Sequence, residues 1–190
     1  DYNDSYSAET SSLPLYGNLV GFSFKNQQWE TAPRFFKSAI SCTHSFNYVL
    51  RDRLKNEFTL PASKSEWKVQ QVPFVTSASL TAKLLADTLK KDVMVQRKAW
   101  DPLAKIYYSG LLDSLYVPML HESDNMIAEH LLLLIAAKNQ WPAGAQDIIS
   151  RLKKESNFEF TKAVRWVDGS GLSRYNLFRP MDFIEILRAL

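Results

Sequence analysis

The feature that most constrains the fold of this chain is a polar triplet that leads into a long apolar segment. Ser123, Asp124 and Asn125 come shortly before residues 131–137, which are all apolar. Ser, Asp and Asn are preferred at a helix N-cap, where a side-chain oxygen accepts a hydrogen bond from a free backbone N–H group. The sequence therefore predicts a buried helix over residues 125–138, with a hydroxyl, a carboxylate and a carboxamide fixed at its start.

A second polar segment, Asp-Gly-Ser-Gly-Leu-Ser-Arg-Tyr-Asn, follows at residues 168–176. Its glycines allow positive φ and close backbone approach, and Asp and Ser side chains stabilise such a turn by bonding to their own loop. The run is not a Gly-x-Ser-x-Gly nucleophile elbow, because residue 168 is Asp, so Ser170 is a poor candidate nucleophile. We interpret Arg174 as part of a structural ion pair rather than as a group that orients a carboxylate. The residues interpreted as loop architecture are Asp168, Gly169, Ser170, Gly171 and Arg174.

The two segments together, Ser-Asp-Asn-Met-Ile-Ala-Glu at residues 123–129 and the run at residues 168–176, closely resemble the class C low-molecular-mass penicillin-binding proteins. These are D-alanyl-D-alanine carboxypeptidases and endopeptidases of the bacterial cell wall. The resemblance covers about residues 76–190 and implies an α+β fold. It implies that residues 75–190 are part of a transpeptidase-like (serine β-lactamase-like) domain with the Ser-Asp-Asn box. Residues 1–74 are then part of an accessory, mainly β domain.

The resemblance also implies a chemistry and partners. In such acyl-transfer sites a Ser nucleophile is deprotonated by a nearby Lys and forms an acyl-serine intermediate, and the leaving amine must receive a proton. The resemblance assigns the proton relay to Ser123, substrate positioning to Asn125 and a structural role to Asp124. The expected partners are a peptidoglycan stem peptide ending in D-Ala-D-Ala and β-lactam antibiotics, and the expected location is the periplasm or cell envelope of a bacterium.

Two boxes of this family have no convincing match in the chain. No Lys-Thr-Gly, Lys-Ser-Gly or His-Thr-Gly occurs. Residues 65–68 and 150–153 match the nucleophile pattern Ser-x-x-Lys literally. However, Ser65 lies in the expected accessory region and Ser150 follows the Ser-Asp-Asn box, so neither is favoured. We expect both boxes to lie outside this chain, in the remainder of its own protein, and we expect the chain alone to be inactive.

Two other functions remain possible alternatives to the hypothesis that the chain is part of an enzyme. A non-catalytic peptidoglycan-binding or structural relative would keep the fold and lose the chemistry. An unrelated α+β interaction domain would require both motif matches to be coincidental, and the polar triplet would then be only a helix cap.

Composition argues against several other functions. The 46% hydrophobic content supports a real core, and the net charge of +3 is too small to indicate nucleic-acid binding. The only histidines are His44, His121 and His130, which lack metal-ligand spacing, and no Gly-rich phosphate loop follows a strand, so no metal or other cofactor is expected. The longest apolar run is too short to cross a bilayer, and residues 1–7 do not resemble a signal peptide.

Hydrophobic periodicity predicts the remaining elements. Strands are expected over residues 15–24, 67–74, 93–95 and 162–167, with turns at residues 26–29 and 61–65. The signals conflict over residues 35–60. Helices are expected after Thr76 and Ser77 or Ser79 (inner face Leu80, Leu84, Leu85, Leu89), over residues 112–119, from Pro142 (inner face Ile148, Ile149, Leu152) and from Pro180 (inner face Phe183, Ile184, Leu187).

Overall fold

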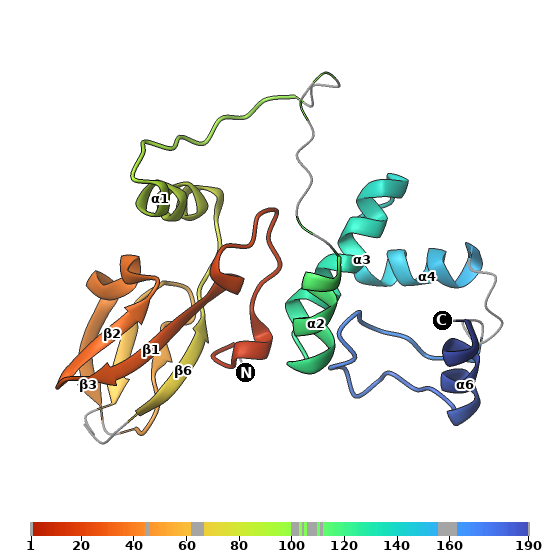
Figure 1. Cartoon of the computed structure of the whole chain (residues 1–190), viewed down its shortest axis with the longest axis horizontal. Coiled ribbons are helices and arrows are strands. Elements are labelled where there is room, and N and C mark those ends of the chain that lie inside the picture. The colour runs from red at the N-terminus through yellow and green to blue at the C-terminus, as the bar shows by residue number, and fades with distance from the viewer. Residues whose placement is uncertain are drawn as a thin grey trace. The chain divides into compact units, whose positions relative to one another are not determined.

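A computed structural model describes residues 2–44, 46–61, 67–99, 103, 105, 110, 112–155 and 163–189, with the backbone alone described at residues 42–44, 67 and 68. The chain forms two compact units, residues 1–107 and residues 108–190 (Figure 1). All six strands named in the described part lie in the first unit, and helices predominate in the second. The expected α+β class is therefore confirmed, whereas the division into domains at residues 74 and 75 stays a prediction.

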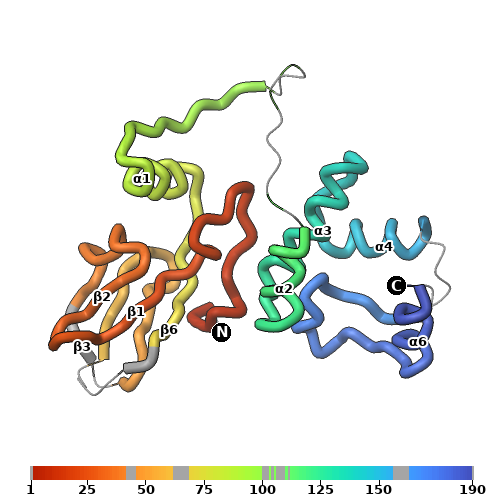
Figure 2. Tube along the Cα trace, in the orientation of Figure 1, coloured from red at the N-terminus to blue at the C-terminus, as the bar shows by residue number. Residues whose placement is uncertain are grey.

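The first unit contains two three-stranded sheets, in the orders β2-β1-β6 and β3-β5-β4. The first sheet is antiparallel throughout, and in the second β3 and β5 are parallel. The strands are β1 (Leu19–Lys25), β2 (Gln28–Ala32), β3 (Ile40–His44), β4 (Leu50–Arg51), β5 (Phe58–Pro61) and β6 (Trp67–Pro73). Helix α1 (Ala78–Leu89) follows β6 along the chain (Figure 2). Short 3-10 turns cover Ser5–Ser7, Tyr16–Asn18 and Arg34–Ala39.

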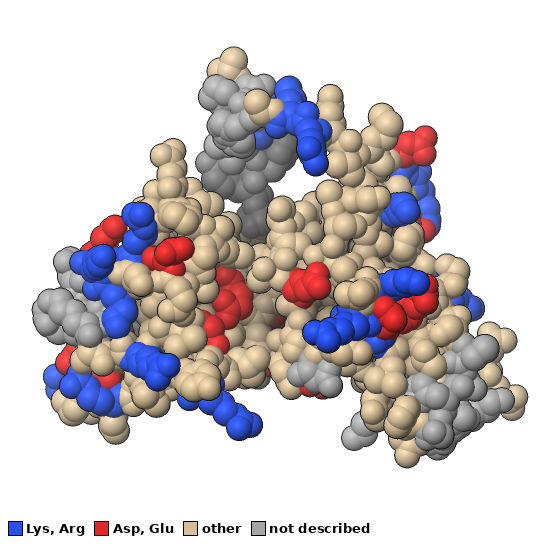
Figure 3. All heavy atoms as spheres, turned by 180° about the vertical axis from the view of Figure 1, so that it is seen from behind, with Lys and Arg blue, Asp and Glu red and all other residues tan. Residues whose placement is uncertain are grey.

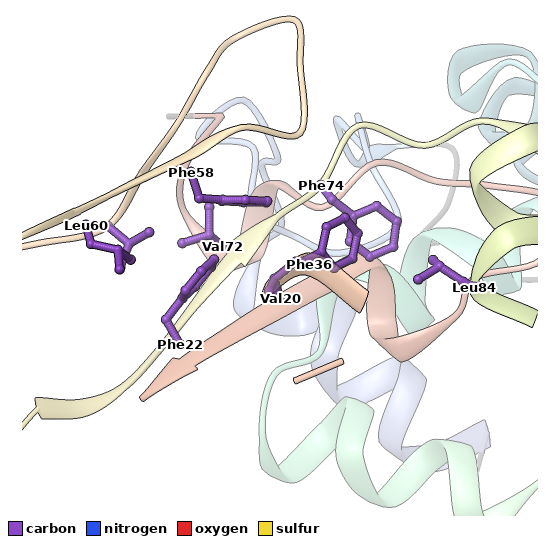
Figure 4. Close-up of a cluster of buried hydrophobic side chains, with 9 residues drawn as sticks. Val20, Phe22, Phe36, Phe58, Leu60, Val72, Phe74 and Leu84 are labelled. Atoms are coloured by element: carbon purple, nitrogen blue, oxygen red, sulfur yellow. The ribbon is translucent and has the colours of Figure 1, made fainter. Parts of the chain in front are cut away.

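Aromatic side chains dominate the core of the first unit (Figure 4). The rings of Phe22 and Phe58 lie 5.0 Å apart, and those of Phe36 and Phe74 lie 5.1 Å apart. Such ring pairs add about 0.5–1.5 kcal/mol beyond the burial of their area. Helix α1 contributes Leu84 to this cluster, so the helix and both sheets share one core. The buried members are Val20, Phe22, Phe36, Val49, Phe58, Leu60, Val72, Phe74 and Leu84.

The sequence predicts most of the first sheet correctly. β1 buries Val20 and Phe22 as the alternation requires, but it begins at residue 19 because residues 16–18 form a 3-10 turn. The turn predicted over residues 26–29 is only partly right: Asn26 and Gln27, both at positive φ, form it, whereas Gln28 and Trp29 already pair with β1 in β2. The predicted strand ending at Pro73 is confirmed as β6.

Other predictions for the first unit are wrong, partly right or outside the described residues. The strand predicted over residues 93–95 is wrong, because this extended segment pairs with none of the described strands. The described residues of the 35–60 range, where the sequence signals conflict, form part of a 3-10 turn and short strands, and they contain no α-helix. Ser77 caps α1 as expected, although Leu89 is exposed. Most of the loop predicted over residues 61–65 lies outside the described residues.

The second unit is built from helices and one irregular segment. The helices named in its described part are α2 (Asp113–His121), α3 (Asn125–Asn139), α4 (Ala145–Glu155) and α6 (Pro180–Ala189). Its core is formed where α3 packs on α4, and the buried members are Leu132, Ala136, Ile148 and Ile149. Trp141 and Trp166 pack against these residues. Between α4 and α6, Arg165 and Leu177 form an isolated antiparallel bridge.

Several predictions for this unit are only partly right. α3 has the predicted start, but it is not buried all round: Leu134 is 60% exposed, because α4 packs on the stripe formed by Leu132 and Ala136. α2 forms as predicted with Pro118 inside it, yet none of its residues is buried. The strand predicted over residues 162–167 is wrong for the described residues 163–167. Among these residues only Arg165 forms a β-bridge, which is its single bridge to Leu177.

The helix predicted from Pro142 begins later. Helix α4 starts at Ala145, and its inner residues Ile148 and Ile149 are buried as expected. Gln140 has a positive φ of 56°, and the N–H of Trp141 donates to Ala136 O at 2.8 Å, which closes the C-terminus of α3. Pro142 therefore follows the C-cap of α3, a position where proline is common, rather than opening α4.

Helix α6 begins at Pro180 as predicted, but its apolar residues do not face inward among the described residues. Phe183, Ile184 and Leu187 are 55%, 40% and 71% exposed. The buried residue is instead Asp182, whose carboxylate accepts the backbone N–H of Arg179 at 2.6 Å and forms an ion pair with its guanidinium at 2.8 Å. Hydrogen bonding from Arg179 lowers the pKa of the Asp182 carboxyl.

Charge is spread rather than concentrated. On the face that Figure 3 presents, Lys and Arg side chains are interspersed with Asp and Glu. Arg51 is a buried charged residue: it is 5% exposed, and burial lowers the pKa of its guanidinium.

Among the described residues, no helix is both long and apolar enough to span a bilayer.

Candidate active site

The polar triplet divides its roles at the start of α3. Asp124 is the N-cap, and its Oδ1 accepts the N–H of Ile127 at 3.1 Å. Asn125 is the first helical residue, so its carboxamide is attached to a rigid backbone. The carboxylate of the triplet is thus used in holding the loop, whereas the hydroxyl and the carboxamide are not needed for the cap.

Ser123 stands in a strained backbone position. Its φ is 55°, in the left-handed region that side chains other than glycine rarely adopt. The C-terminus of α2 fixes this turn, because Pro118 O accepts the N–H of Glu122 at 3.0 Å and that of Asp124 at 3.4 Å. The same left-handed conformation closes α1 at Lys90 and α3 at Gln140, so at Ser123 it marks the end of a helix. Ser123 itself is exposed.

The second motif is a turn organised by one carboxylate. Asp168 Oδ1 accepts the N–H of Gly171 at 2.8 Å and the Asn176 amide at 2.7 Å, and its Oδ2 accepts the N–H of Ser173 at 2.6 Å. Gly171 has a φ of +76°, which explains the glycine there. The Oδ1 atom of Asn176 accepts the N–H of Val167 at 2.7 Å. The turn therefore satisfies the backbone N–H groups of Gly171, Ser173 and Val167 with its own side chains.

Helix α4 holds the segment that precedes this turn. Gln146 donates to Val167 O at 2.7 Å, and Lys153 Nζ donates to Val164 O at 2.6 Å. Lys153 is the lysine of the literal Ser-x-x-Lys match at residues 150–153. Its ammonium group donates a hydrogen bond to the carbonyl of Val164. The other literal match begins at Ser65, which lies outside the described residues.

The two motifs lie against each other. The backbone N–H of Ser170 donates to Glu129 Oε1 on α3 at 2.9 Å, across 41 positions of sequence. A Cβ at Gly169 would lie 2.8 Å from Leu132 Cδ1 and 3.0 Å from Ala128 O. Only glycine allows this close approach of the turn to the helix.

Sequence reasoning missed the role of Glu129. Glu129 belongs to the first motif, but its residue type alone assigns it no function. The available signal is its spacing, because a residue four positions after Asn125 lies on the same face of a helix. Arg174 is exposed and makes no ion pair within the described part of the chain, so its structural ion pair stays a prediction. Across the residues that the structure describes, no group of three or more His, Cys, Asp and Glu side chains could hold a metal ion.

Sequence comparison assigns the family. The model of the D-Ala-D-Ala carboxypeptidase 3 (S13) family matches residues 49–190, which include both motifs. The chain belongs to this family. The resemblance to penicillin-binding carboxypeptidases, drawn from two short motifs, is thereby confirmed, and the match extends further toward the N-terminus than those motifs indicate.

Proposed function

We propose that this chain forms the proton-relay and substrate-side wall of a serine-type D-Ala-D-Ala carboxypeptidase or endopeptidase that acts on peptidoglycan peptides. The observation that carries the proposal is the hydrogen bond from Ser170 N–H to Glu129, which joins the two family motifs in one place. Membership of the family supports peptidoglycan peptides as the substrate class and the bacterial cell envelope as the location. On this proposal residues 75–190 belong to a transpeptidase-like domain and residues 1–74 to an accessory domain.

The proposed chemistry is acyl transfer. A serine nucleophile attacks the carbonyl carbon of the penultimate D-alanine, and the peptide C–N bond then breaks to give an acyl-serine ester and the amine of the leaving D-alanine. The proton taken from the nucleophile must reach that amine. Water later cleaves the ester, which returns the serine hydroxyl and releases the shortened peptide.

Ser123 suits the relay, because a hydroxyl accepts one proton while it donates another. Its backbone is held in the short turn between α2 and α3, where Pro118 O accepts the N–H groups of the two neighbouring residues. Asn125 suits substrate binding, because a carboxamide offers both a donor and an acceptor to the amide backbone of a peptide. Asp124 acts only through the cap that keeps the two neighbouring residues in place.

Labelled penicillin tests this proposal. We expect the 190-residue chain alone to form no covalent adduct, because it supplies no nucleophile. We expect the parent protein, with Ser-x-x-Lys and Lys-Thr-Gly boxes, to form one. There, Ser123→Ala should slow acylation by about 10²-fold or more, the range of a lost proton-transfer group.

Exposed Ser150 on α4 provides the matched control, and Ser150→Ala should leave acylation unchanged. An adduct on the isolated chain would overturn the assignment of the nucleophile to another segment. A parent protein that is never acylated would favour a non-catalytic peptidoglycan-binding relative instead.

A further inference from the structure

Glu129 connects the two motifs of the site. Its Oε1 atom accepts the backbone N–H of Ser170 at 2.9 Å, and both residues are half-buried. Glu129 lies one helical turn after Asn125, so both side chains project from the same face of α3. The 168–171 turn is therefore placed on the face of α3 that carries the carboxamide.

The turn does not need Glu129 in order to fold. Asp168 accepts three hydrogen bonds from within the turn, and helix α4 holds the preceding segment through Gln146 and Lys153. None of these hydrogen bonds joins the turn directly to α3. The Glu129 carboxylate is the one acceptor on α3 that the described structure gives to the backbone of this turn.

Close approach and the hydrogen bond occur at adjacent residues. Gly169 lies so near the helix that an added Cβ would clash with Leu132 and Ala128, and Ser170 is held by the Glu129 carboxylate. The missing side chain at Gly169 lets the turn come this near to α3, and the hydrogen bond limits how far it can move away. The two together hold the turn on α3 at residues 128–132, on the face that also carries Asn125.

We propose that Glu129 is a positioning residue, which holds the 168–171 turn against α3 so that the turn and Asn125 form one continuous wall for the substrate peptide. This inference rests on the proposed function, because it assigns Glu129 a role in substrate binding through Asn125 and the turn. Glu129 does not itself take part in proton transfer.

The test uses the isotope-labelled 190-residue chain and three variants. Glu129→Ala removes the acceptor, Glu129→Gln keeps an amide oxygen at its place, and Glu155→Ala removes an exposed carboxylate at the end of α4 as a control. The first readout is hydrogen exchange at the Ser170 amide. We expect about tenfold or faster exchange in Glu129→Ala, because the amide loses its hydrogen bond to a charged acceptor. Glu129→Gln should recover most of the protection, and Glu155→Ala should match the wild type.

The second readout is the affinity for N-acetyl-D-Ala-D-Ala, followed through the amide resonances of Asn125 and Ser170. We expect about tenfold weaker binding in Glu129→Ala, partial rescue by Glu129→Gln and no change in Glu155→Ala. A residue that only stabilised the fold would lower stability without altering the affinity of the folded protein. Wild-type affinity in Glu129→Ala, or no rescue by glutamine, would overturn the inference.

The two proposals fail in different ways. If the wild-type chain binds no peptide, the substrate-binding role proposed for this wall is wrong, and with it the role of Glu129 in binding. If the wild type binds and Ser170 exchange is the same in Glu129→Ala, the proposed function stands and the positioning role of Glu129 is wrong.

Discussion

Substitution of Gly169 by alanine tests the contact between the turn and α3 most severely. The added Cβ would lie 2.8 Å from Leu132 Cδ1 and 3.0 Å from Ala128 O, well inside the ordinary contact distance of about 3.5–4.0 Å. Leu132 is 6% exposed in the core, and Ala128 O belongs to the helix backbone. Neither atom can move aside cheaply, so the turn must shift and the 2.9 Å hydrogen bond from Ser170 to Glu129 must lengthen.

The expected cost follows from these two effects. Overpacking in a well-packed region costs about 1–3 kcal/mol. Loss of a hydrogen bond to a charged group costs about 1.5–3 kcal/mol. The shift that breaks the hydrogen bond also relieves the clash, so the two costs do not add in full. The lower chain entropy of unfolded alanine offsets about 0.4–1 kcal/mol. We therefore expect Gly169→Ala to destabilise the second unit by about 2–4 kcal/mol.

Native-state hydrogen exchange at the most protected amides of α3 and α4 measures this loss separately from the first unit. Gly144→Ala is the matched control. Its Cβ would lie 2.9 Å from Asp147 Oδ2, but that atom ends a flexible side chain that can rotate away. Gly144 precedes the first residue of α4 and caps it, where alanine is less favoured than glycine, so the control should cost about 1 kcal/mol or less. Equal effects of the two substitutions would refute the close packing of the turn on α3.

Three further predictions concern the cap, the last helix and the first core. Asp124→Ala should destabilise the second unit by about 1 kcal/mol, measured by the same exchange method, because the N-cap of α3 is lost. Because Arg179 lowers the pKa of Asp182, this pair contributes stability that is present above the ordinary value of 3.8 and is lost as the pH falls through the lower folded-state value. The protection factors of the α6 amides, which correct for the pH dependence of intrinsic exchange, should therefore fall at acid pH, and Arg179→Gln should weaken that dependence. Phe36→Ala should cost the first unit about 3–5 kcal/mol in urea denaturation, because Phe36 is 1% exposed among aromatic rings.

The sequence predicts the elements whose local signals agree with their tertiary setting. The alternation of Val20 and Phe22 survives in β1 because one face of the sheet covers the core. The start of α3 is predicted to the residue, because Asp124 supplies a cap whose chemistry is local.

Local patterns mislead where partners decide the structure. The apolar residues at 93–95 form no strand, since none of the described strands pairs with them. Leu187 is exposed although its spacing indicates an inner face, because spacing does not show which neighbour covers a helix. The role of Glu129 depends on a contact with Ser170 across 41 positions, and no local signal gives such a contact.

The central claim is that Ser123 and Asn125 face the reacting peptide bond in a site that includes the 168–171 turn. The crystal structure of the parent protein acylated by a β-lactam tests it directly. We predict that the Asn125 carboxamide and the Ser123 hydroxyl each lie within hydrogen-bond distance of the bound acyl group, with Glu129 still holding the Ser170 N–H. An adduct bound elsewhere, with both side chains turned away from it, would contradict the claim.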